Sequence, residues 1–517
     1  MKNANSISKY FLLVFLFMIS FLCANGQNKK DVLPEPKIQF GMAKVTGSVR
    51  NLKLDKGEKI VKFIIRFYNP ISGIDSKYET KLDSSNRFKI EVPLECSTAI
   101  AGFSIEAETN NYGYGMLGIS EEKELKVAID YDKNGVMNFV TSGGLDLSKE
   151  DLQHVGEASE LFDEYCTISN FYKMTPSEFV DHELNVSLKG KLHIALDSLT
   201  FSNKIRKYLI DALSLYFIEG RVFCYKQEAE DSFKGSKMEN PFYMDYAAAE
   251  PDISYYSFLK DYQLNDPQYL YGFDYSNFLE RFLAIPAFKI PKIKDTPINV
   301  WLDGVKETVK DVVGFESGLF YDMLVGKAYA IQINEQKVPL TLQQVENIQN
   351  YFTNKKQDFS IILNKNNNEL PNILEKNKDL KVNEVPVVPK EDLMDAIITK
   401  YKGKVILVDF WATWCNPCMD AHKEMKSLKA ELKEKGVVFV YLVNSSSPRL
   451  KWEGKIKGIG GEQYYISAEA WDYVLDHFGF TTIPTYMIYD QDGKLIQKFT
   501  GFPGTDKMRG IIEELLH

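Results

Sequence analysis

The sequence predicts a multidomain protein in which an all-β, sandwich-like part is followed by a mostly α-helical part and a C-terminal α/β part. At 517 residues the chain is too long for one ordinary domain. Its hydrophobic pattern changes from strand alternation to a helical period near residue 145. From about residue 376, strand and helix patterns alternate, which favours a sheet covered by helices.

Composition and charge limit the kinds of partner that the protein can have. Apolar residues make up 44% of the chain and charged residues 26%, the balance of a soluble globular protein. The formal net charge is −9, and we find no sustained basic cluster. Because phosphate binding needs clustered lysine and arginine, we expect no nucleic-acid partner.

Residues 1–26 have the pattern of a signal peptide. The apolar stretch Phe11–Leu22 is too short to span a bilayer comfortably, and we expect cleavage after Gly26. Cys23 leaves lipid anchoring open as an alternative, although Leu22 stands where lipoprotein signals usually carry a small residue. An uncleaved anchor is a third option. We therefore expect a periplasmic protein that meets the membrane only if it is anchored at Cys23.

Five cysteines remain after the predicted cleavage: Cys96, Cys166, Cys224, Cys415 and Cys418. Export places them in an oxidising compartment, where cysteines tend to pair. Outside the close pair the number is odd, so at least one of the other three has no partner among them. A disulfide between Cys166 and Cys224 is possible, but we favour buried free thiols.

The first predicted part, residues 38–142, is rich in short alternating segments. Turn residues separate the predicted strands, and this spacing is typical of a β-sandwich. We find no catalytic constellation in it and expect an accessory or docking module. The clearest predicted strands are 44–50, 60–68, 87–92 and 125–130.

The second predicted part, residues 145–355, has a helical period. Thr175 and Glu178 frame a capping box with a proline at the first helical position. Residues 354–383 are rich in lysine and asparagine, and we interpret them as a tether with a boundary near residue 376. Further helices are expected over 254–262, 275–283, 317–333 and 341–353.

The last predicted part, residues 376–517, alternates strand and helix. Lys404–Phe410 is a continuous apolar run that suits a central strand buried on both faces. A helix is expected over Asn416–Lys435, directly after it. We also expect a short strand at Val385–Pro389 and a closing strand hairpin and helix, which together give a mixed sheet covered on both faces.

Two cysteines stand at the start of that helix, in the segment Trp-Cys-Asn-Pro-Cys. Free backbone N–H groups and the positive end of the helix dipole favour a thiolate at Cys415, and the thiolate is the attacking species. Pro417 is tolerated in a first helical turn. Cys418 lies one turn further on, close enough to close a disulfide ring. We expect Cys415 to be the exposed nucleophile and Cys418 to resolve the mixed disulfide.

These residues carry a family resemblance. Trp-Cys-x-Pro-Cys follows a strand that ends Val-Asp-Phe-Trp-Ala, and Thr482-Ile-Pro-Thr485 precedes a later strand. Residues 376–517 therefore resemble the thioredoxin-like superfamily, and most closely its exported thiol-disulfide oxidoreductases of the TlpA and ResA type; residues 446–478 resemble the insert of that group. The resemblance implies a protein-disulfide oxidoreductase without a cofactor, which acts on protein disulfide clients and needs an external electron-donating thiol-disulfide partner.

The resemblance also implies roles for individual residues. Asp409 matches the buried acid that relays protons behind the dithiol, and burial is expected to raise its pKa. Ile483 and Pro484 match a cis-proline loop whose backbone pairs with an extended substrate chain. Trp414 is expected to flank the site, and Gly501 matches a groove glycine.

Two nearby positions bear on the direction of electron flow. The reductase type often has glutamate where this chain has Ala421, and thioredoxins have a kinking proline where it has Lys423. The redox potential is therefore not fixed by the sequence, although the insert favours a reductase.

His422 lies about 10 Å along the helix from Cys415, too far to be its base. We expect a packing or surface role for it.

Three other functions are compatible with part of this sequence pattern: zinc binding, peroxidase activity and a scaffold role. A zinc site needs a second ligand pair, and none is present in the sequence. A thiol peroxidase would have a lone attacking cysteine with a proline before it, whereas here Cys415 is one of two close cysteines and no proline precedes it nearby. A binding or scaffold protein that carries a redox adaptor domain stays open, because about 350 residues precede the last part.

Overall fold

The computed structural model describes residues 32–107, 110–145, 147–164, 170–237, 246–272, 274–353, 355 and 357–516. The predicted signal peptide with Cys23, and Cys166, lie outside the described residues. Within the described residues, no helix combines the length and the apolar character needed to cross a bilayer.

Two four-stranded sheets form the N-terminal part, as the alternating pattern predicts. Their orders are β4-β1-β7-β8 and β3-β2-β5-β6. Phe63 and Phe88 stack between the sheets with ring centroids 4.0 Å apart. The strands are β1 (Ile38–Arg50), β2 (Lys62–Tyr68), β3 (Asp75–Lys81), β4 (Arg87–Cys96), β5 (Thr98–Glu106), β6 (Asn111–Ser120), β7 (Leu125–Tyr131) and β8 (Met137–Ser142).

Helices dominate the chain from residue 149 to residue 376. The predicted capping box is confirmed: the Glu178 N–H donates to Thr175 Oγ1, and the Thr175 N–H donates to Glu178 Oε2. One continuous cluster of buried residues, from Leu33 to Leu370, joins these helices to the sheets.

The α-helices are α2 (Lys149–Glu164), α3 (Pro176–His182), α4 (Lys189–Asp197), α5 (Asn203–Gly220), α6 (Tyr225–Lys237), α7 (Tyr275–Ala284), α8 (Ile298–Val313), α9 (Leu319–Ala330), α10 (Leu342–Thr353) and α11 (Phe359–Lys376). Short 3₁₀ and π segments lie between them: η1 (Phe171–Lys173), η2 (Glu183–Leu188), η3 (Val222–Cys224), η4 (Ile253–Asp261), η5 (Pro267–Tyr271), η6 (Pro286–Phe288) and η7 (Ile331–Glu335).

The predicted tether is wrong, because α11 occupies most of it. Phe359, Ile362, Leu363 and Leu370 recur at helical spacing and are buried against the core. The lysines and asparagines of this segment occupy the remaining, more exposed face. Burial of one apolar stripe thus decides the conformation of a segment whose overall composition is polar.

The C-terminal part is built on a six-stranded mixed sheet, as predicted. Its order is β14-β13-β10-β11-β12-β9. Strands β9 to β12 run parallel, and β13 and β14 are antiparallel to their neighbours. Alternate residues of β10 enter two separate buried clusters, which shows that both faces of the sheet are covered.

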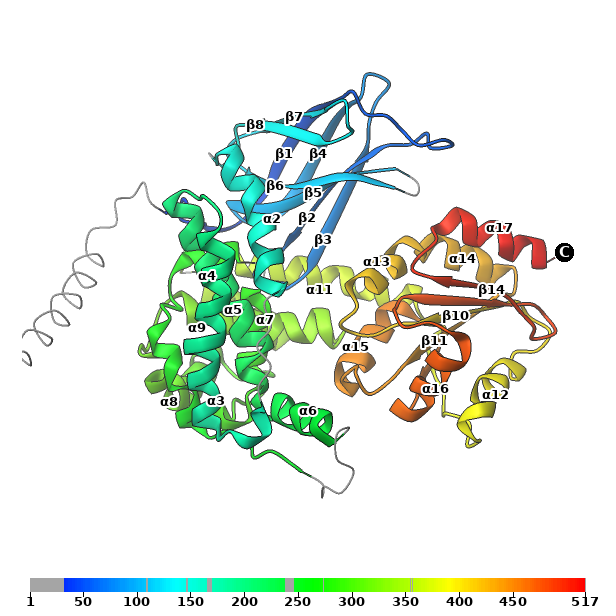
Figure 1. Cartoon of the computed structure of the whole chain (residues 1–517). Helices are drawn as coiled ribbons and strands as arrows, with labels where there is room; N and C mark the ends of the chain where they lie inside the picture. Colours follow the sequence, from blue (N-terminus) through cyan, green and yellow to red (C-terminus); the bar gives the residue numbers. More distant parts are fainter. Residues whose placement is uncertain are drawn as a thin grey trace, which may run out of the picture.

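The strands of this sheet are β9 (Lys381–Val382), β10 (Ile406–Phe410), β11 (Val438–Val443), β12 (Glu462–Tyr465), β13 (Thr485–Tyr489) and β14 (Leu495–Thr500). The helices are η8 (Lys390–Asp392), α12 (Leu393–Thr399), α13 (Asn416–Glu424), α14 (Lys426–Glu434), α15 (Arg449–Ile459), α16 (Ala468–Phe478) and α17 (Thr505–Leu515). Figure 1 shows the C-terminal part beside the other two, with α11 running towards it.

Two local predictions differ from the structure. Val385–Pro389 is not a strand; its two prolines cannot donate to a sheet, and the strand lies just before it at β9. The helix predicted over Asn416–Lys435 is divided at Met425 into α13 and α14.

Candidate active site

The Cys415–Cys418 disulfide closes the first turn of α13. The buried strand β10 ends at Phe410, and a short turn brings Cys415 to the N-cap of the helix. The Cys418 N–H donates to Cys415 Sγ at 3.2 Å, and the two Cα atoms lie 5.3 Å apart. The ring that the spacing predicts is therefore present, with its first sulfur at the positive end of a helix.

The two sulfurs differ little in exposure, which corrects the prediction of an exposed Cys415. Cys415 is 4% exposed and Cys418 is fully buried. Both residues belong to the buried cluster beneath α13. Trp414, by contrast, is 61% exposed, and its indole N–H donates to Ser446 Oγ.

A second loop brings the other predicted residues together. The Ile483–Pro484 peptide bond is cis, as the resemblance implies. The Gly501 N–H donates to Pro484 O at 2.8 Å, and Gly501 has a φ of +85°, a conformation that favours glycine. Ile483 packs against the same cluster that contains both cysteines. Ile483 also packs against the cluster on the opposite face of the sheet, so the loop touches the cluster that contains the disulfide without being confined to that side.

Asp409 is buried beneath α13, near the end of β10. Its carboxylate is 1% exposed, and its Oδ2 lies 2.9 Å from His422 Nε2. Burial raises the pKa of Asp409, while the charge and hydrogen bond of His422 and the charge of Lys429 partly oppose this effect. The result is a carboxyl group that can hold or release a proton in an apolar setting.

His422 is packed in the interior, one of the two roles predicted for it, but its contact with Asp409 was not predicted. Its side chain is 6% exposed and its ring lies edge-on to Trp411 and Tyr441, with centroids 5.1 and 5.5 Å away. A signal for this position is present in the sequence: His422 follows the buried Cys418 by four residues, so both lie on one face of the helix. The spacing alone does not reveal that Asp409 lies beneath that face.

Two further cysteines that the structure describes, Cys96 and Cys224, are not part of this site. Cys96 is buried and Cys224 is half-buried, and both are free thiols. Burial raises the pKa of each thiol, so neither is an activated nucleophile. In the part of the chain that the structure describes, no three His, Cys, Asp or Glu side chains are grouped so that they could hold a metal ion.

Comparison with known proteins places this site in a family. A family model described as Redoxin matches residues 365–516. The thiol-disulfide oxidoreductase ResA of Geobacillus thermodenitrificans is 30% identical over 118 residues, which cover 23% of this chain and 67% of that protein. ResA of Bacillus thuringiensis is 25% identical over 114 residues, 22% of this chain and 65% of that protein. The chain thus spans about two thirds of the length of these curated relatives.

Solved structures match over the same share of the chain. The thioredoxin domain of a thiol-disulfide oxidoreductase from Bacteroides vulgatus is 19% identical, with a TM-score of 0.21, and covers 23% of this chain and 84% of that one. A thiol:disulfide interchange protein from Chlorobium tepidum is 25% identical, also with a TM-score of 0.21 and the same coverage.

The raised pKa of Asp409 predicts a pH-dependent effect on stability. Above pH 3.8 the Asp409 carboxyl ionises in the unfolded chain, whereas in the folded protein it stays protonated until the pH reaches its higher pKa. Between these two pKa values, the free energy of unfolding of the wild type falls as the pH rises. Asp409→Asn removes this loss. Over that pH range the free energy of unfolding of the variant should rise relative to that of the wild type, by about 1.4 kcal/mol for each unit of pKa shift. Below pH 3.8 it should show no such rise.

Denaturant unfolding across pH measures this gain. Asp472→Asn, at an exposed position on α16, is the matched control and should show no such trend. If the gain in free energy of unfolding for Asp409→Asn is the same at every pH, the raised pKa of Asp409 in the folded protein is contradicted.

Proposed function

Because the chain belongs, through its C-terminal part, to the thioredoxin-like thiol-disulfide oxidoreductases of the ResA type, we propose that it is an exported enzyme that reduces protein disulfides at Cys415 and Cys418. One observation carries the proposal. The two cysteines form a disulfide across the first turn of α13, at a helix N-terminus and on the same buried cluster as a cis-proline loop.

The exchange proceeds in two steps from the reduced enzyme. The Cys415 thiolate attacks one sulfur of the client disulfide, and the other client sulfur leaves as a thiolate. Cys418 then attacks Cys415 Sγ, which releases the second client sulfur and closes the Cys415–Cys418 bond. Two electrons pass to the client, and the two client thiolates take up two protons. The N-terminus of α13 stabilises the negative charge on Cys415 before the attack.

Asp409 and His422 serve the second step. Cys418 must lose its proton before it can attack, and Asp409 is the buried acid that takes it up. His422 holds the carboxylate from one side at 2.9 Å and stabilises its charged form. Both side chains are almost fully buried, at 2% and 6% exposure, so solvent screens the contact between them very little.

Client binding involves the cis-proline loop and the exposed tryptophan. An extended client chain pairs with the backbone of Ile483 in the manner of strand addition. The bond from Gly501 to Pro484 O holds the loop in place. Trp414 offers an exposed aromatic surface next to Cys415.

The proposed direction is reduction, in the periplasm, with electrons supplied by an external thiol-disulfide partner. The segment that contains α15, β12 and α16 supports this direction, since it resembles the insert of the TlpA and ResA group. Lipidation at Cys23 is one way in which the protein would be anchored to the membrane.

The proposed exchange predicts an asymmetric result for the two cysteine variants. Cys418→Ser leaves Cys415 able to attack but unable to be released, so mixed disulfides with clients accumulate. Cys415→Ser forms none. Non-reducing electrophoresis followed by mass spectrometry measures both. Equal trapping by the two variants would overturn the assigned roles, and absence of trapping by both would favour the alternative of a binding or scaffold protein.

The proposed direction predicts the redox potential. Dithiol oxidoreductases range from about −120 mV for strong oxidants to about −270 mV for reductants. Equilibration of the full chain with glutathione buffers should place the Cys415–Cys418 couple near the reducing end. A value near −120 mV would reverse the direction and leave the exchange chemistry intact.

A further inference from the structure

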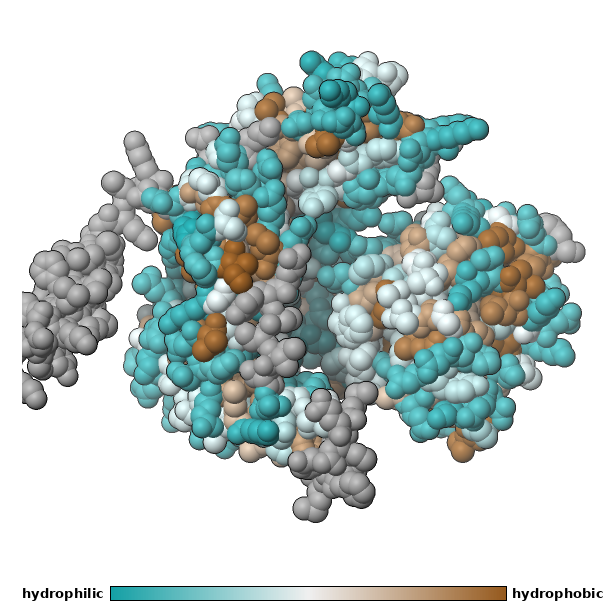
Figure 2. Space-filling view, viewed as in Figure 1, coloured by the Kyte–Doolittle hydropathy of each residue, from teal (hydrophilic) through white to brown (hydrophobic). Residues whose placement is uncertain are grey.

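A large cavity lies where the three parts of the chain meet. Its volume is about 1250 Å³, and its walls come from the loop between β2 and β3, the region of α7, η7 and α11, and the helices α13 to α15. Trp414, Asn416 and Met419 line it, so it opens beside the residues that flank and separate the two cysteines. The space-filling view shows a hydrophilic hollow between the C-terminal part and the rest of the molecule (Figure 2).

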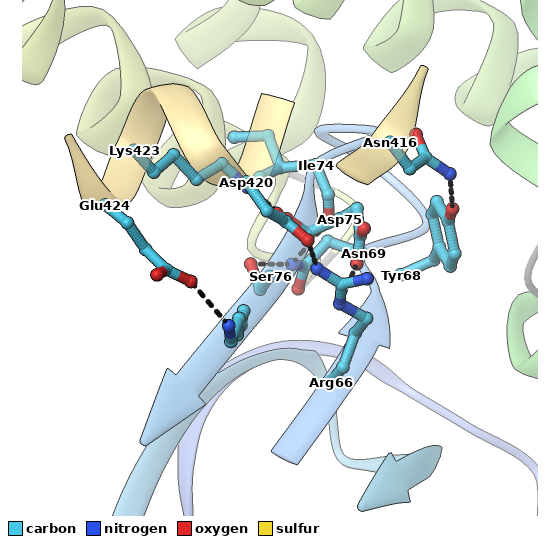
Figure 3. Close-up of polar contacts among 11 residues, drawn as sticks. Arg66, Tyr68, Asn69, Ile74, Asp75, Ser76, Asn416, Asp420, Lys423 and Glu424 are labelled. Atoms are coloured by element: carbon cyan, nitrogen blue, oxygen red, sulfur yellow. Dashed lines mark hydrogen bonds and ion pairs between the residues drawn. The ribbon is translucent and has the colours of Figure 1, made fainter. Parts of the chain in front are cut away.

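The β2–β3 hairpin is fastened to α13 at one side of this cavity (Figure 3). Arg66 forms an ion pair with Asp420. The Asn416 side-chain amide donates to the Tyr68 hydroxyl at 3.3 Å, so the hairpin reaches a residue between the two cysteines. Two further contacts join the hairpin to the helix: Lys77 Nζ to Glu424 Oε1 at 3.0 Å, and Lys423 Nζ to Asp75 O at 3.3 Å.

The other side of the cavity is held by α15. Gly454 lies so close to the backbone carbonyl of Glu335 that a side chain there would overlap it. Lys451 pairs with Glu280 at 2.6 Å, and Lys457 donates to Gln336 O at 2.8 Å. The cavity is thus framed by specific contacts on two sides, all of which join the C-terminal part to the preceding ones.

Lysines dominate the wall that the C-terminal part contributes. Six line the cavity from α13, α14 and α15: Lys423, Lys426, Lys429, Lys433, Lys451 and Lys455. The same helices contribute only Asp420 and Glu434 as carboxylates, and Arg66 already pairs with Asp420.

The opposite wall carries both signs of charge, but its carboxylates are largely paired. Arg281 lies 2.8 Å from Glu219, and Lys433 reaches across to Asp379. Among the described residues, no ion pair joins a carboxylate to Lys337, Lys376 or Lys426, which all line the cavity. Nine lysine and arginine side chains line the cavity against seven carboxylates, so positive charge is in excess by two.

We propose that this cavity binds the client, and that it takes an acidic, extended polypeptide segment next to the client disulfide. The inference rests on the proposed function. Small-molecule sites usually enclose about 300–1,000 Å³ and are mostly apolar. This cavity is larger and lined by charged side chains, which suits a hydrated polypeptide better than a small ligand. Excess lysine in a cleft attracts and orients an acidic chain.

The proposal also gives the first two parts of the chain a function. The hairpin that contacts α13 forms one boundary of the cavity, and the helical part forms another. Client choice then depends on all three parts, while the exchange chemistry depends on the C-terminal part alone.

The full-length reduced enzyme tests the proposal with three disulfide probes. Two are peptides with one internal disulfide, flanked by glutamates in one and by lysines in the other; the third is the small neutral bis(2-hydroxyethyl) disulfide. The test variant is Lys337→Glu/Lys376→Glu/Lys426→Glu. The matched control, Lys402→Glu/Lys404→Glu/Lys494→Glu, changes three exposed lysines outside the cavity by the same charge.

We expect the wild type and the control to reduce the acidic peptide at least tenfold faster, in kcat/KM, than the basic one, with an advantage that falls as salt is added. For the test variant, kcat/KM on the acidic peptide should fall at least tenfold, while kcat/KM on the small disulfide should stay unchanged. Lys426→Glu alone should lose about threefold, which keeps the test valid if the triple variant does not fold.

Three results would overturn the proposal: no preference in the wild type, preference for the basic peptide, or equal losses in the test variant and the control. Each would leave the cavity as a solvent-filled gap or a site for other clients. A wild type that reduces none of the three probes would instead contradict the proposed function, so the two failures are distinguishable.

Discussion

The proposed chemistry of this protein depends on a sulfur atom at the N-cap of a helix. Cys415 Sγ accepts a hydrogen bond from the Cys418 N–H and lies where the dipole of α13 is positive. Strand β10 fixes the start of that helix, and Pro417 removes an N–H that has no intrahelical partner there. The remaining features of the site, the buried acid and the cis-proline loop, are placed by strands that neighbour the same helix.

Helix α13 also links the chemistry to the rest of the molecule. Its inner face carries Cys418 and His422, and His422 contacts Asp409. Its outer face carries Asp420 and Glu424, which pair with Arg66 and with the neighbouring strand β3 of the hairpin. One short helix therefore contacts both the Asp409–His422 pair and the N-terminal sheets. Under the proposed function, this double contact gives the preceding 350 residues a route by which they would influence which disulfides are reduced.

Local patterns predicted the strands and helices of the mixed sheet and the Cys415–Cys418 ring, because each depends on residues that are close in sequence. The cis bond before Pro484 was predicted from the family resemblance. The positions that prediction missed depend on distant contacts. His422 meets Asp409 only once α13 packs on β10, and α11 is helical because its apolar stripe meets a core built by other elements. The contact of Asn416 with Tyr68 joins residues 348 positions apart, and no local pattern encodes it.

The pKa of the Cys415 thiol in the reduced full-length protein tests the central claim most directly. The rate of alkylation of Cys415 as a function of pH, measured in Cys418→Ser so that one thiol of the pair reports, gives this value. Stabilisation of the thiolate at the N-terminus of α13 predicts a pKa well below the free-cysteine value of about 8.5. A pKa at or above about 8.5 would show that the helix does not activate the thiol and would contradict the account.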